Sequence, residues 1–477
     1  MKGLVWLRFL LLLLIGGVLS LSFRAEPLRV WPKKRPNIIY ILADDLGYGD
    51  LSCYGQVRFR TPNLDRMAAE GLRFTQFYSG STVCAPSRCA LMSGQHTGHA
   101  YIRGNGEIPL REQDVILPQY LKQAGYATGM FGKWGLGVPG TSGSPEKKGW
   151  DAFFGYPHHV QAHFQYPDTL WQLTNGQVGP VVMQGRPFAN DVIVERALDF
   201  MQENRQKPFF LYLALTIPHA ELRVPQDAMA PFQTFDGRSR FEPETPYPGA
   251  HYGPQPQPRA AYAAMIRKVD DYVGAVMNQL NDLGLTDETL VMFSSDNGTH
   301  VEGGRTAGDV TFFQSSGPYR GIKRDLYEGG IRVPFIVRWP GAVPAGKTVT
   351  APTANWDLLP TLLELTRQRA TPPLDGVSLV PLLRGKSPKN DRVFYWEFHE
   401  KGFSQAVRKG DWKLIRFYRP NMEPRTELYR LDTDPTEQRD LAGQEPERVK
   451  ELEQLMNQSR TPAEHPAFRA KLLAGER

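Results

Sequence analysis

The sequence predicts an α/β protein with a mainly parallel sheet sandwiched by helices, followed by a smaller antiparallel sheet. Short apolar runs alternate with helical patterns along most of the chain, and several runs end in charged or polar side chains. Beyond about residue 387, short strand patterns follow one another without helices between them. Alternating strands and helices are typical of parallel sheets, because each connection must carry the chain back across a face of the sheet.

The clearest strand pattern covers residues 37–43, a nearly continuous apolar run typical of a strand buried on both faces. Further strands are expected at 126–132, 209–216, 289–294 and 331–339. Helical patterns lie between the strands, and two of them close on a glycine. They cover residues 63–71, 117–124, 191–203, 260–283 and 356–365. The Pro- and Gly-rich segment 232–258 is expected to be a surface loop.

The C-terminal part has a different character, with short spaced strands and one closing helix. The strands are expected at 393–398, 405–409, 412–417 and 427–431, and the helix at 446–458. We therefore expect a catalytic domain over residues 35–386 and a C-terminal subdomain over residues 387–477.

The N-terminus has the pattern of a secretory signal, which we place at residues 1–24. Lys2 and Arg8 precede an apolar run that is short for a membrane span. No clear cleavage pattern follows, so an uncleaved anchor is the alternative. The expected location is periplasmic or extracellular, with no stable membrane span once the signal is removed.

The charge and cysteine content narrow the function classes. The net charge of +6 is compatible with an anionic substrate or with solubility alone. No Lys/Arg cluster is interleaved with aromatic residues, so nucleic acid is not an expected partner. The three cysteines, Cys53, Cys84 and Cys89, cannot all pair in an oxidising compartment. The chain is therefore not built on a disulfide framework.

Polar residues stand at or just past the ends of the predicted strands: Asp44, Asp45, Lys133, His219, Asp296 and Asn297. In open α/β sheets, ligands bind at this edge, so we expect these distant residues to converge there. Carboxylate and amide oxygens suit Ca²⁺ or Mg²⁺ rather than Zn²⁺. An Asp pair after a strand is also common as a cap or turn, which is the alternative interpretation.

The sharpest motif is Cys84-Ala-Pro-Ser-Arg-Cys-Ala-Leu-Met-Ser-Gly94, which resembles the formylglycine signature of the type I sulfatases. Other segments match that family in order: Gly132-Lys133-Trp134, Pro218-His219, Ser295-Asp296-Asn297-Gly298, Gly321-Ile322-Lys323 and Tyr327 to Pro334. The resemblance covers about residues 35–441, and it favours the arylsulfatase and N-acetylgalactosamine-sulfatase-like branch. It implies an alkaline-phosphatase-like fold and hydrolysis of a sulfate ester, with a sulfated sugar or polysaccharide as the expected substrate.

The resemblance also implies the chemistry and the roles. A formylglycine-generating enzyme or an anaerobic sulfatase-maturating enzyme would oxidise Cys84 to an aldehyde, whose hydrate attacks sulfur. Arg88 would hold the hydrate, and His219 would protonate the leaving alcohol. The resemblance further implies that Asp44, Asp45, Asp296, Asn297 and the modified side chain of Cys84 bind calcium, and that Lys133 and Lys323 bind the sulfate.

One position departs from the family pattern. The family commonly has histidine two residues after the first lysine, whereas this chain has Gly135. His158, His159, His163 and His300 are candidate substitutes. Among them, His300 is expected to lie nearest the metal ligands, and His163 is expected to meet the sugar. Arg103 is a further candidate for substrate binding, with pairing to a nearby carboxylate as the alternative.

Two other functions remain open from the sequence. Related enzymes hydrolyse phosphate esters, but they commonly use Thr or Ser and Zn²⁺ with histidine ligands. A degenerate sulfatase acting as a carbohydrate-binding protein is the second alternative, and Gly135 is its only support. Retention of Cys84, Arg88 and the predicted metal ligands favours the enzyme.

Overall fold

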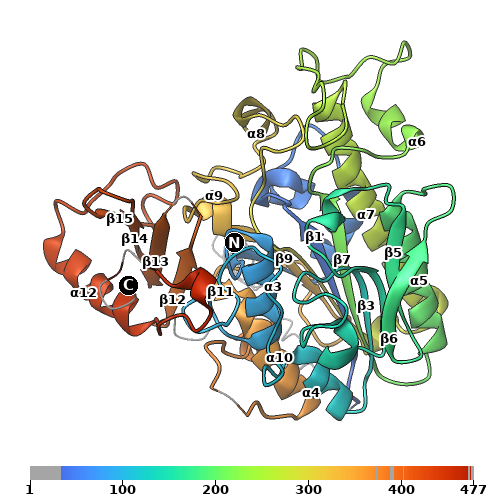
Figure 1. Cartoon of the computed structure of the whole chain (residues 1–477), viewed down its shortest axis with the longest axis horizontal. Coiled ribbons are helices and arrows are strands. Elements are labelled where there is room, and N and C mark those ends of the chain that lie inside the picture. Colours follow the sequence, from blue (N-terminus) through green and yellow to red (C-terminus); the bar gives the residue numbers. More distant parts are fainter. Residues whose placement is uncertain (1–33, 372, 387–390, 401, 471–472, 474–477) are drawn as a thin grey trace, which may run out of the picture. The chain divides into compact units, whose positions relative to one another are not determined.

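A computed structural model describes residues 34–371, 373–386, 391–400, 402–470 and 473 (Figure 1). The predicted signal segment 1–24 and the predicted start of the C-terminal subdomain at residue 387 lie outside these residues. Within the described ranges, no helix has both the length and the apolar character needed to cross a bilayer.

The larger of the two sheets has eleven strands and is mixed but mostly parallel around its centre. Its order is β10-β2-β9-β8-β1-β7-β3-β4-β5-β6, and β11 also pairs with β2. The strands are β1 (Asn37–Asp44), β2 (Leu72–Tyr78), β3 (Ala127–Lys133), β4 (Ala152–Tyr156), β5 (Thr169–Thr174), β6 (Gln177–Val182), β7 (Phe209–Pro218), β8 (Thr289–Ser295), β9 (Arg332–Arg338), β10 (Lys347–Val349) and β11 (Thr353–Ala354).

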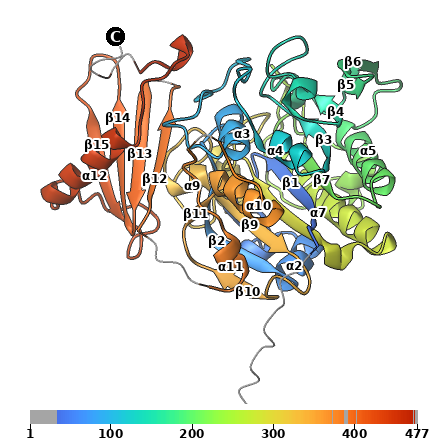
Figure 2. The same ribbon diagram turned by 90° about the horizontal axis from the view of Figure 1, so that it is seen from below.

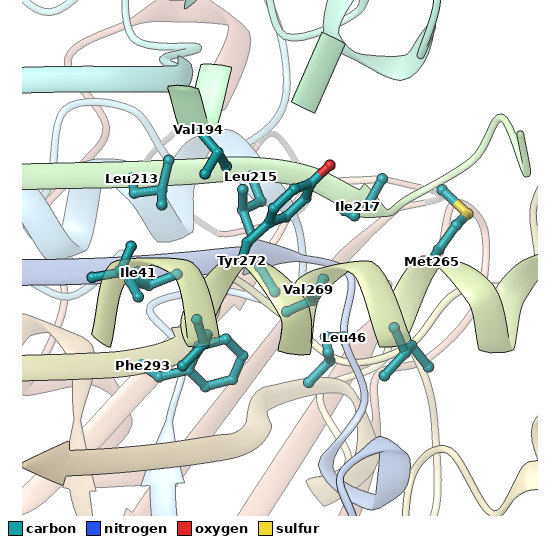
Figure 3. Packing of buried hydrophobic residues seen from close by; sticks show 14 of the residues in the cluster. Ile41, Leu46, Val194, Leu213, Leu215, Ile217, Met265, Val269, Tyr272 and Phe293 are labelled. Carbon is teal, nitrogen blue, oxygen red and sulfur yellow. The ribbon is translucent and has the colours of Figure 1, made fainter. Parts of the chain in front are cut away.

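Strand β1 lies in the middle of the sheet, and its apolar sequence explains this position. It pairs in parallel with β7 on one side and β8 on the other. All eight of its residues are buried, as its continuous apolar run predicts. Ile39 and Ile41 belong to a core that also contains Val269 and Met265 of helix α7 (Pro258–Asp282), which Figure 3 shows packed along the strands. Ile38 alternates to the opposite face and is equally buried.

The other helices pack in two groups. Helix α7 contacts α2 (Pro62–Ala69) and α5 (Ala189–Glu203), and α5 also packs on β3 and β7. A second group consists of α3 (Cys84–Ser93), α4 (Leu117–Gln123) and α10 (Leu358–Thr366), which contact one another. Figure 2 shows these elements around the sheet. Short helices α6 (Gln226–Met229), α8 (Ala307–Phe313), α9 (Glu328–Ile331) and α11 (Val380–Leu383) complete this part.

The second sheet is a four-stranded antiparallel meander, drawn in orange to red in Figure 1. Its strands are β12 (Val393–Phe398), β13 (Phe403–Lys409), β14 (Trp412–Tyr418) and β15 (Arg425–Arg430), and helix α12 (Pro446–Gln458) covers one face. Tyr395, Leu414 and Leu428 of the sheet share a small core with Leu452 and Met456 of α12. Both predicted sheets are therefore confirmed.

The structure adds elements that the sequence analysis did not predict. Strands β5 and β6 form a hairpin whose turn is Asn175-Gly176, both with positive φ. Asn-Gly between two strands is a strong hairpin signal, so this element could have been found. The predicted strand at 331–339 exists as β9, but it runs antiparallel to both β8 and β2.

Candidate active site

The predicted polar residues do meet at one edge of the large sheet. Asp44 is the last residue of β1, and Lys133 is the last residue of β3. His219 follows β7, while Asp296 and Asn297 follow β8. Because β1 pairs with β7 and β8, and β7 pairs with β3, the four strand ends are neighbours in the sheet. The convergence follows from parallel pairing, which places all carboxyl ends at the same edge.

Helix α3 brings the motif residues to that edge. Cys84 is its first residue and is 1% exposed, and its Sγ lies 3.5 Å from Asp44 Oδ1. Arg88 follows one turn later on the same face. Its Nε and Nη2 donate to Asp296 Oδ2 at 3.1 and 2.8 Å, and its Nη1 donates to the Lys133 carbonyl at 2.6 Å. One guanidinium thus ties the helix to the ends of β8 and β3.

The two lysines each pair with one aspartate of the adjacent pair. Lys133 Nζ donates to Asp44 Oδ2 at 2.6 Å, and Lys323 Nζ donates to Asp45 Oδ2 at 2.7 Å. Asp45 has a left-handed φ of 63°, which an aspartate tolerates better than most residues. This turn sends the two neighbouring carboxylates to different partners, so the Asp pair serves both lysines.

His219 lies beside Lys323 on the second side of the site. Its Nδ1–H donates to the Ala220 carbonyl at 2.5 Å, which leaves Nε2 as the acceptor for Lys323 Nζ at 2.9 Å. The same Nε2 lies 3.3 Å from Asp45 Oδ2 and 3.5 Å from Glu302 Oε2. Burial, followed by the charge of Lys323, holds the pKa of His219 well below its usual value. In this geometry, the proton shared with Nε2 lies on Lys323 Nζ.

The site balances three buried carboxylates, those of Asp44, Asp45 and Asp296, against the cations Arg88, Lys133 and Lys323. Burial raises the pKa values of Asp45 and Asp296, and neighbouring cations oppose that shift only in part. A divalent cation would relieve the desolvation of these carboxylates. It would also leave the site with a net positive charge, which suits an anionic substrate.

The unmodified thiol is a poor nucleophile here. Burial raises the pKa of Cys84 far above the ordinary thiol value, and Asp44 adds to this, although Lys133 opposes it. A thiol nucleophile needs the thiolate form, which this environment suppresses. The residues around position 84 by themselves therefore disfavour the thiolate.

Asn297 offers a specific test of whether the residues suit a metal ion. Its Nδ2 donates to Asp45 Oδ1 at 2.6 Å and to the Gly298 carbonyl at 3.0 Å, which fixes the orientation of the amide. Its Oδ1 is buried and lacks a hydrogen-bond partner. An unsatisfied buried acceptor costs about 1–3 kcal/mol. With the aspartate oxygens nearby, this free acceptor completes an oxygen-only donor set that fits Ca²⁺.

His300 lies near a predicted metal ligand, with a ring nitrogen within 4.8 Å of a carboxylate oxygen of Asp45. His300 is buried, and both its nitrogens are occupied: Nε2 donates to the Pro218 carbonyl at 2.9 Å, and Nδ1 accepts from the Glu302 amide at 3.1 Å. His163 lies closer to His219, and the centroids of the two stacked rings are 3.9 Å apart. Its buried Nε2 has no partner, while Tyr252 lies 3.3 Å from its Nδ1. His163, rather than His300, has a nitrogen left for a ligand.

Two other predicted positions can be placed. Arg103 is 3% exposed, and its Nη1 donates to Glu397 Oε1 at 3.3 Å and to the Thr461 carbonyl at 2.8 Å, which favours the carboxylate alternative over substrate binding. Gly135 has a left-handed φ of 72°, and a Cβ there would meet only Cβ of His159, at 3.3 Å. Backbone conformation as well as sequence therefore distinguishes this position from one that holds a histidine.

Sequence reasoning missed Glu302. This carboxylate contacts His219 and Lys323 and also accepts from Arg324 Nη1 at 2.6 Å. Burial raises the pKa of Glu302, but Lys323, His300 and Arg324 together lower it to about 2. Its only sequence signal was its place a few residues after Asn297, which does not separate it from an ordinary loop residue.

The fold and the site define a hydrolase of the alkaline phosphatase superfamily. The chain belongs to the sulfatase family: the family profile described as sulfatase matches residues 36–368, and the profile of the C-terminal part of N-sulphoglucosamine sulphohydrolase matches residues 321–462. It is therefore a sulfuric ester hydrolase, as the sequence predicted.

Individual relatives agree with this assignment. The chain is 34% identical to N-acetylgalactosamine-6-sulfatase of Canis lupus familiaris over 76% of this chain and 68% of the relative. It is 30% identical to N-acetylgalactosamine-6-O-sulfatase of Bacteroides thetaiotaomicron over 90% of this chain and 94% of the relative. The crystal structure of Ps i-CgsB in complex with k-i-k-neocarrahexaose matches with a TM-score of 0.74 and 27% identity, covering 89% of this chain and 92% of that chain.

Proposed function

We propose that the chain removes sulfate from a sulfated carbohydrate, using a formylglycine made from Cys84 next to a bound Ca²⁺. The observation that supports this most directly is the position of Cys84. Its Sγ lies within 4.8 Å of carboxylate oxygens of Asp44 and Asp296, and likewise of Asp45. Residue 84 thus stands against the oxygen-rich edge of the sheet, where a modified side chain would meet both the cation and the substrate.

In this proposal, Asp44, Asp45, Asp296 and Asn297 hold the calcium ion. Bound there, the ion would favour the deprotonated form of an oxygen nucleophile on residue 84. Oxidation of Cys84 supplies that oxygen, which the buried thiol cannot replace. Because Cys84 is buried in the folded chain, we propose that a maturating enzyme carries out this oxidation before the chain folds.

Arg88 and Lys133 orient the reacting group on the nucleophile side. Arg88 is held by Asp296 and by the Lys133 carbonyl, so its charge is fixed in place before substrate arrives. Lys133 and Lys323 lie on the two sides of the Asp pair, where their ammonium groups can take up charge on the sulfate oxygens.

His219 and Lys323 serve the leaving group. The lysine donates to His219 Nε2, so the pair holds a proton next to the position where the alcohol departs. His163, stacked on His219, presents its unpartnered Nε2 to the same side and is proposed to contact the substrate. Neither nitrogen of His300 is free for this role, so we assign it to positioning the end of β7.

A sulfated carbohydrate is proposed as the substrate for two reasons. The relatives are named for N-acetylgalactosamine sulfates, and the site is rich in cationic side chains. Export to the periplasm or the extracellular space is proposed on the basis of the basic and apolar pattern at residues 1–24.

We also propose that residues 35–386 and 387–477 act as a catalytic domain and a subdomain of one enzyme.

The proposal is tested by turnover of sulfated sugars against matched phosphate esters, combined with mass spectrometry of the peptide that contains residue 84. We expect sulfate release from at least one sulfated sugar, a strong preference over the phosphate analogue, and an aldehyde at residue 84. Full activity with only a thiol at residue 84 would rule out the nucleophile. Preference for the phosphate ester would instead identify a phosphohydrolase.

A further inference from the structure

A cavity of about 420 Å³ lies directly beside the proposed leaving-group residues. Its lining comes from the segment 301–302, from the segment 322–326 and from three strands of the C-terminal sheet or the residues next to them. The lining includes Glu302, Lys323, Arg324, Phe398, Glu400, Phe417 and Arg419. A volume of this size is in the range of ligand-binding pockets.

The cavity meets the active site on the side of His219. Two of its lining residues, Glu302 and Lys323, are the neighbours of His219 Nε2, at 3.5 and 2.9 Å. A group leaving from a sulfur atom at the lysines would therefore pass from His219 into this cavity. No lining residue belongs to the nucleophile side of the site, which is formed by Cys84, Arg88 and Lys133.

Arg324 gives the cavity its polar character. Its Nη1 donates to Glu302 Oε1 at 2.6 Å, and its Nε donates to Glu400 Oε2 at 2.9 Å. The side chain is 38% exposed. The backbone of Arg324 has a left-handed φ of 76°, an unusual conformation for a non-glycine residue. Strained backbone of this kind is concentrated at ligand sites. A forked donor flanked by two carboxylates offers paired donors and acceptors, which is what vicinal hydroxyl groups require.

The C-terminal sheet supplies the opposite wall. Phe398 ends β12 and Phe417 lies near the end of β14, and both line the cavity as apolar surface. Arg419 follows β14, and its Nη1 donates to the Tyr418 carbonyl at 3.0 Å. A wall with both apolar and charged parts suits a sugar ring, which has apolar C–H faces and a polar edge of hydroxyl groups.

We infer that this cavity is the subsite for the sugar ring that carries the sulfate ester, and that Arg324 selects this ring through its hydroxyl groups. The inference rests on the proposed function and deepens it by naming the part of the chain that recognises the alcohol. An alcohol without hydroxyl groups beside the ester cannot form hydrogen bonds with the charged lining. A site built to bind hydroxyl groups discriminates against such an analogue far more than an apolar pocket does.

The test compares two substrate types on Arg324→Ala. One is a panel of monosaccharides that each carry a single sulfate ester, and the other is an aryl sulfate without hydroxyl groups. We expect kcat/KM for the best sugar sulfate to fall about 10–100-fold, mainly through KM, because a charge-assisted hydrogen bond is lost. For the aryl sulfate, kcat/KM should change less than about 3-fold. Arg324→Lys should have an intermediate effect on the sugar sulfate, because lysine keeps the charge but not the paired donors of the guanidinium group.

A matched control is Arg267→Ala on α7. Arg267 is 42% exposed and pairs with Asp271 at 2.9 Å, so it resembles Arg324 in exposure and pairing but lies outside the cavity lining. Arg267→Ala should leave kcat/KM unchanged for both substrate types. Arg419→Ala probes the opposite wall of the cavity and should lower kcat/KM for the sugar sulfates but not for the aryl sulfate. This second variant tests the subsite even if Arg324→Ala does not fold.

The outcomes separate the subsite from the function. Equal losses on both substrate types in the Arg324 and Arg419 variants, or no loss in either, would overturn the subsite while the wild type still hydrolyses sugar sulfates. If the wild type hydrolyses the aryl sulfate but no member of the sugar panel, the carbohydrate function fails, and the subsite fails with it.

Discussion

The two sides of the active site differ in how far they open. The nucleophile side consists of Cys84, Asp44, Arg88, Lys133 and Asp296, none of which is more than 1% exposed. The leaving-group side consists of Asp45, His219, Glu302 and Lys323 and opens through the last two onto the adjacent cavity. Under the proposed function, the first side keeps a charge and a nucleophile fixed away from water, whereas the second admits alcohols of a particular shape. Substitutions on the two sides are therefore expected to have different effects.

The largest effect is expected for Cys84→Ala, which removes the proposed nucleophile. The rate of sulfate release should fall at least about 10⁴-fold, as for other hydrolases that lose their nucleophile. The measurement is initial-rate sulfate release with the purified variant. Cys89→Ala is the matched control, because Cys89 is also 1% exposed and lies on the same helix. It should keep its activity, and equal loss in both variants would show that the helix, not the thiol position, is what matters.

The second prediction concerns Asp296→Asn, which keeps the shape but removes one charge from the nucleophile side. Calcium content, measured by elemental analysis, and activity should both fall, because the ion loses a ligand charge and Arg88 loses the charge of the carboxylate nearest to it. Asp270→Asn is the control, since this buried carboxylate accepts from the Leu64 amide at 2.8 Å, remote from the site. It should lower stability and leave calcium bound. Undiminished calcium in the Asp296 variant would contradict the ligand assignment.

On the leaving-group side, His219→Ala should affect substrates according to their alcohols. A sugar alcohol needs a proton as it departs, so kcat should fall about 10²–10⁴-fold. A nitrophenyl sulfate has an acidic leaving group and should lose about 10-fold or less. The two substrates are compared on the same enzyme preparation, which makes each the control for the other. Equal losses for both would assign His219 to a role other than protonation.

The smallest effect is expected for His163→Phe. Phenylalanine can keep the stack on His219 but lacks the free Nε2, so kcat/KM for a sugar sulfate should fall about 10-fold with little change in melting temperature. His163→Ala removes the stack as well and should cost more. Full activity of the phenylalanine variant would show that the nitrogen does not contact substrate.

Much of the site was predictable because its residues belong to contiguous motifs. Cys84 and Arg88 are four positions apart on one helix, and Asp44, Asp45, Asp296 and Asn297 directly follow apolar strands. Strand-end position plus parallel pairing was enough to bring them together. The orientation of β9 was not predictable from its own residues, because an apolar run of that length is compatible with either direction.

The histidines show where sequence reasoning ends. Distance along the chain from Asn297 predicted that His300 lies near the metal ligands, and a ring nitrogen of His300 does lie within 4.8 Å of a carboxylate oxygen of Asp45. That distance could not predict that both nitrogens of His300 are occupied, or that His163 stacks closer to His219, at 3.9 Å against 5.6 Å between ring centres. The turn that carries His163 is separated from the catalytic strands in sequence, and only packing brings it back. Arg103 was undecided for the same reason, since its partner Glu397 lies in the C-terminal sheet.

The sequence by itself determined the two sheets, the family and the set of charged residues at the strand ends, since local apolar patterns and short motifs encode them. Only the tertiary structure decided which lysine pairs with which aspartate, which histidine keeps a free nitrogen, and where the cavity opens. These features depend on side chains from distant segments sharing a desolvated space, and no local pattern specifies which of them will meet.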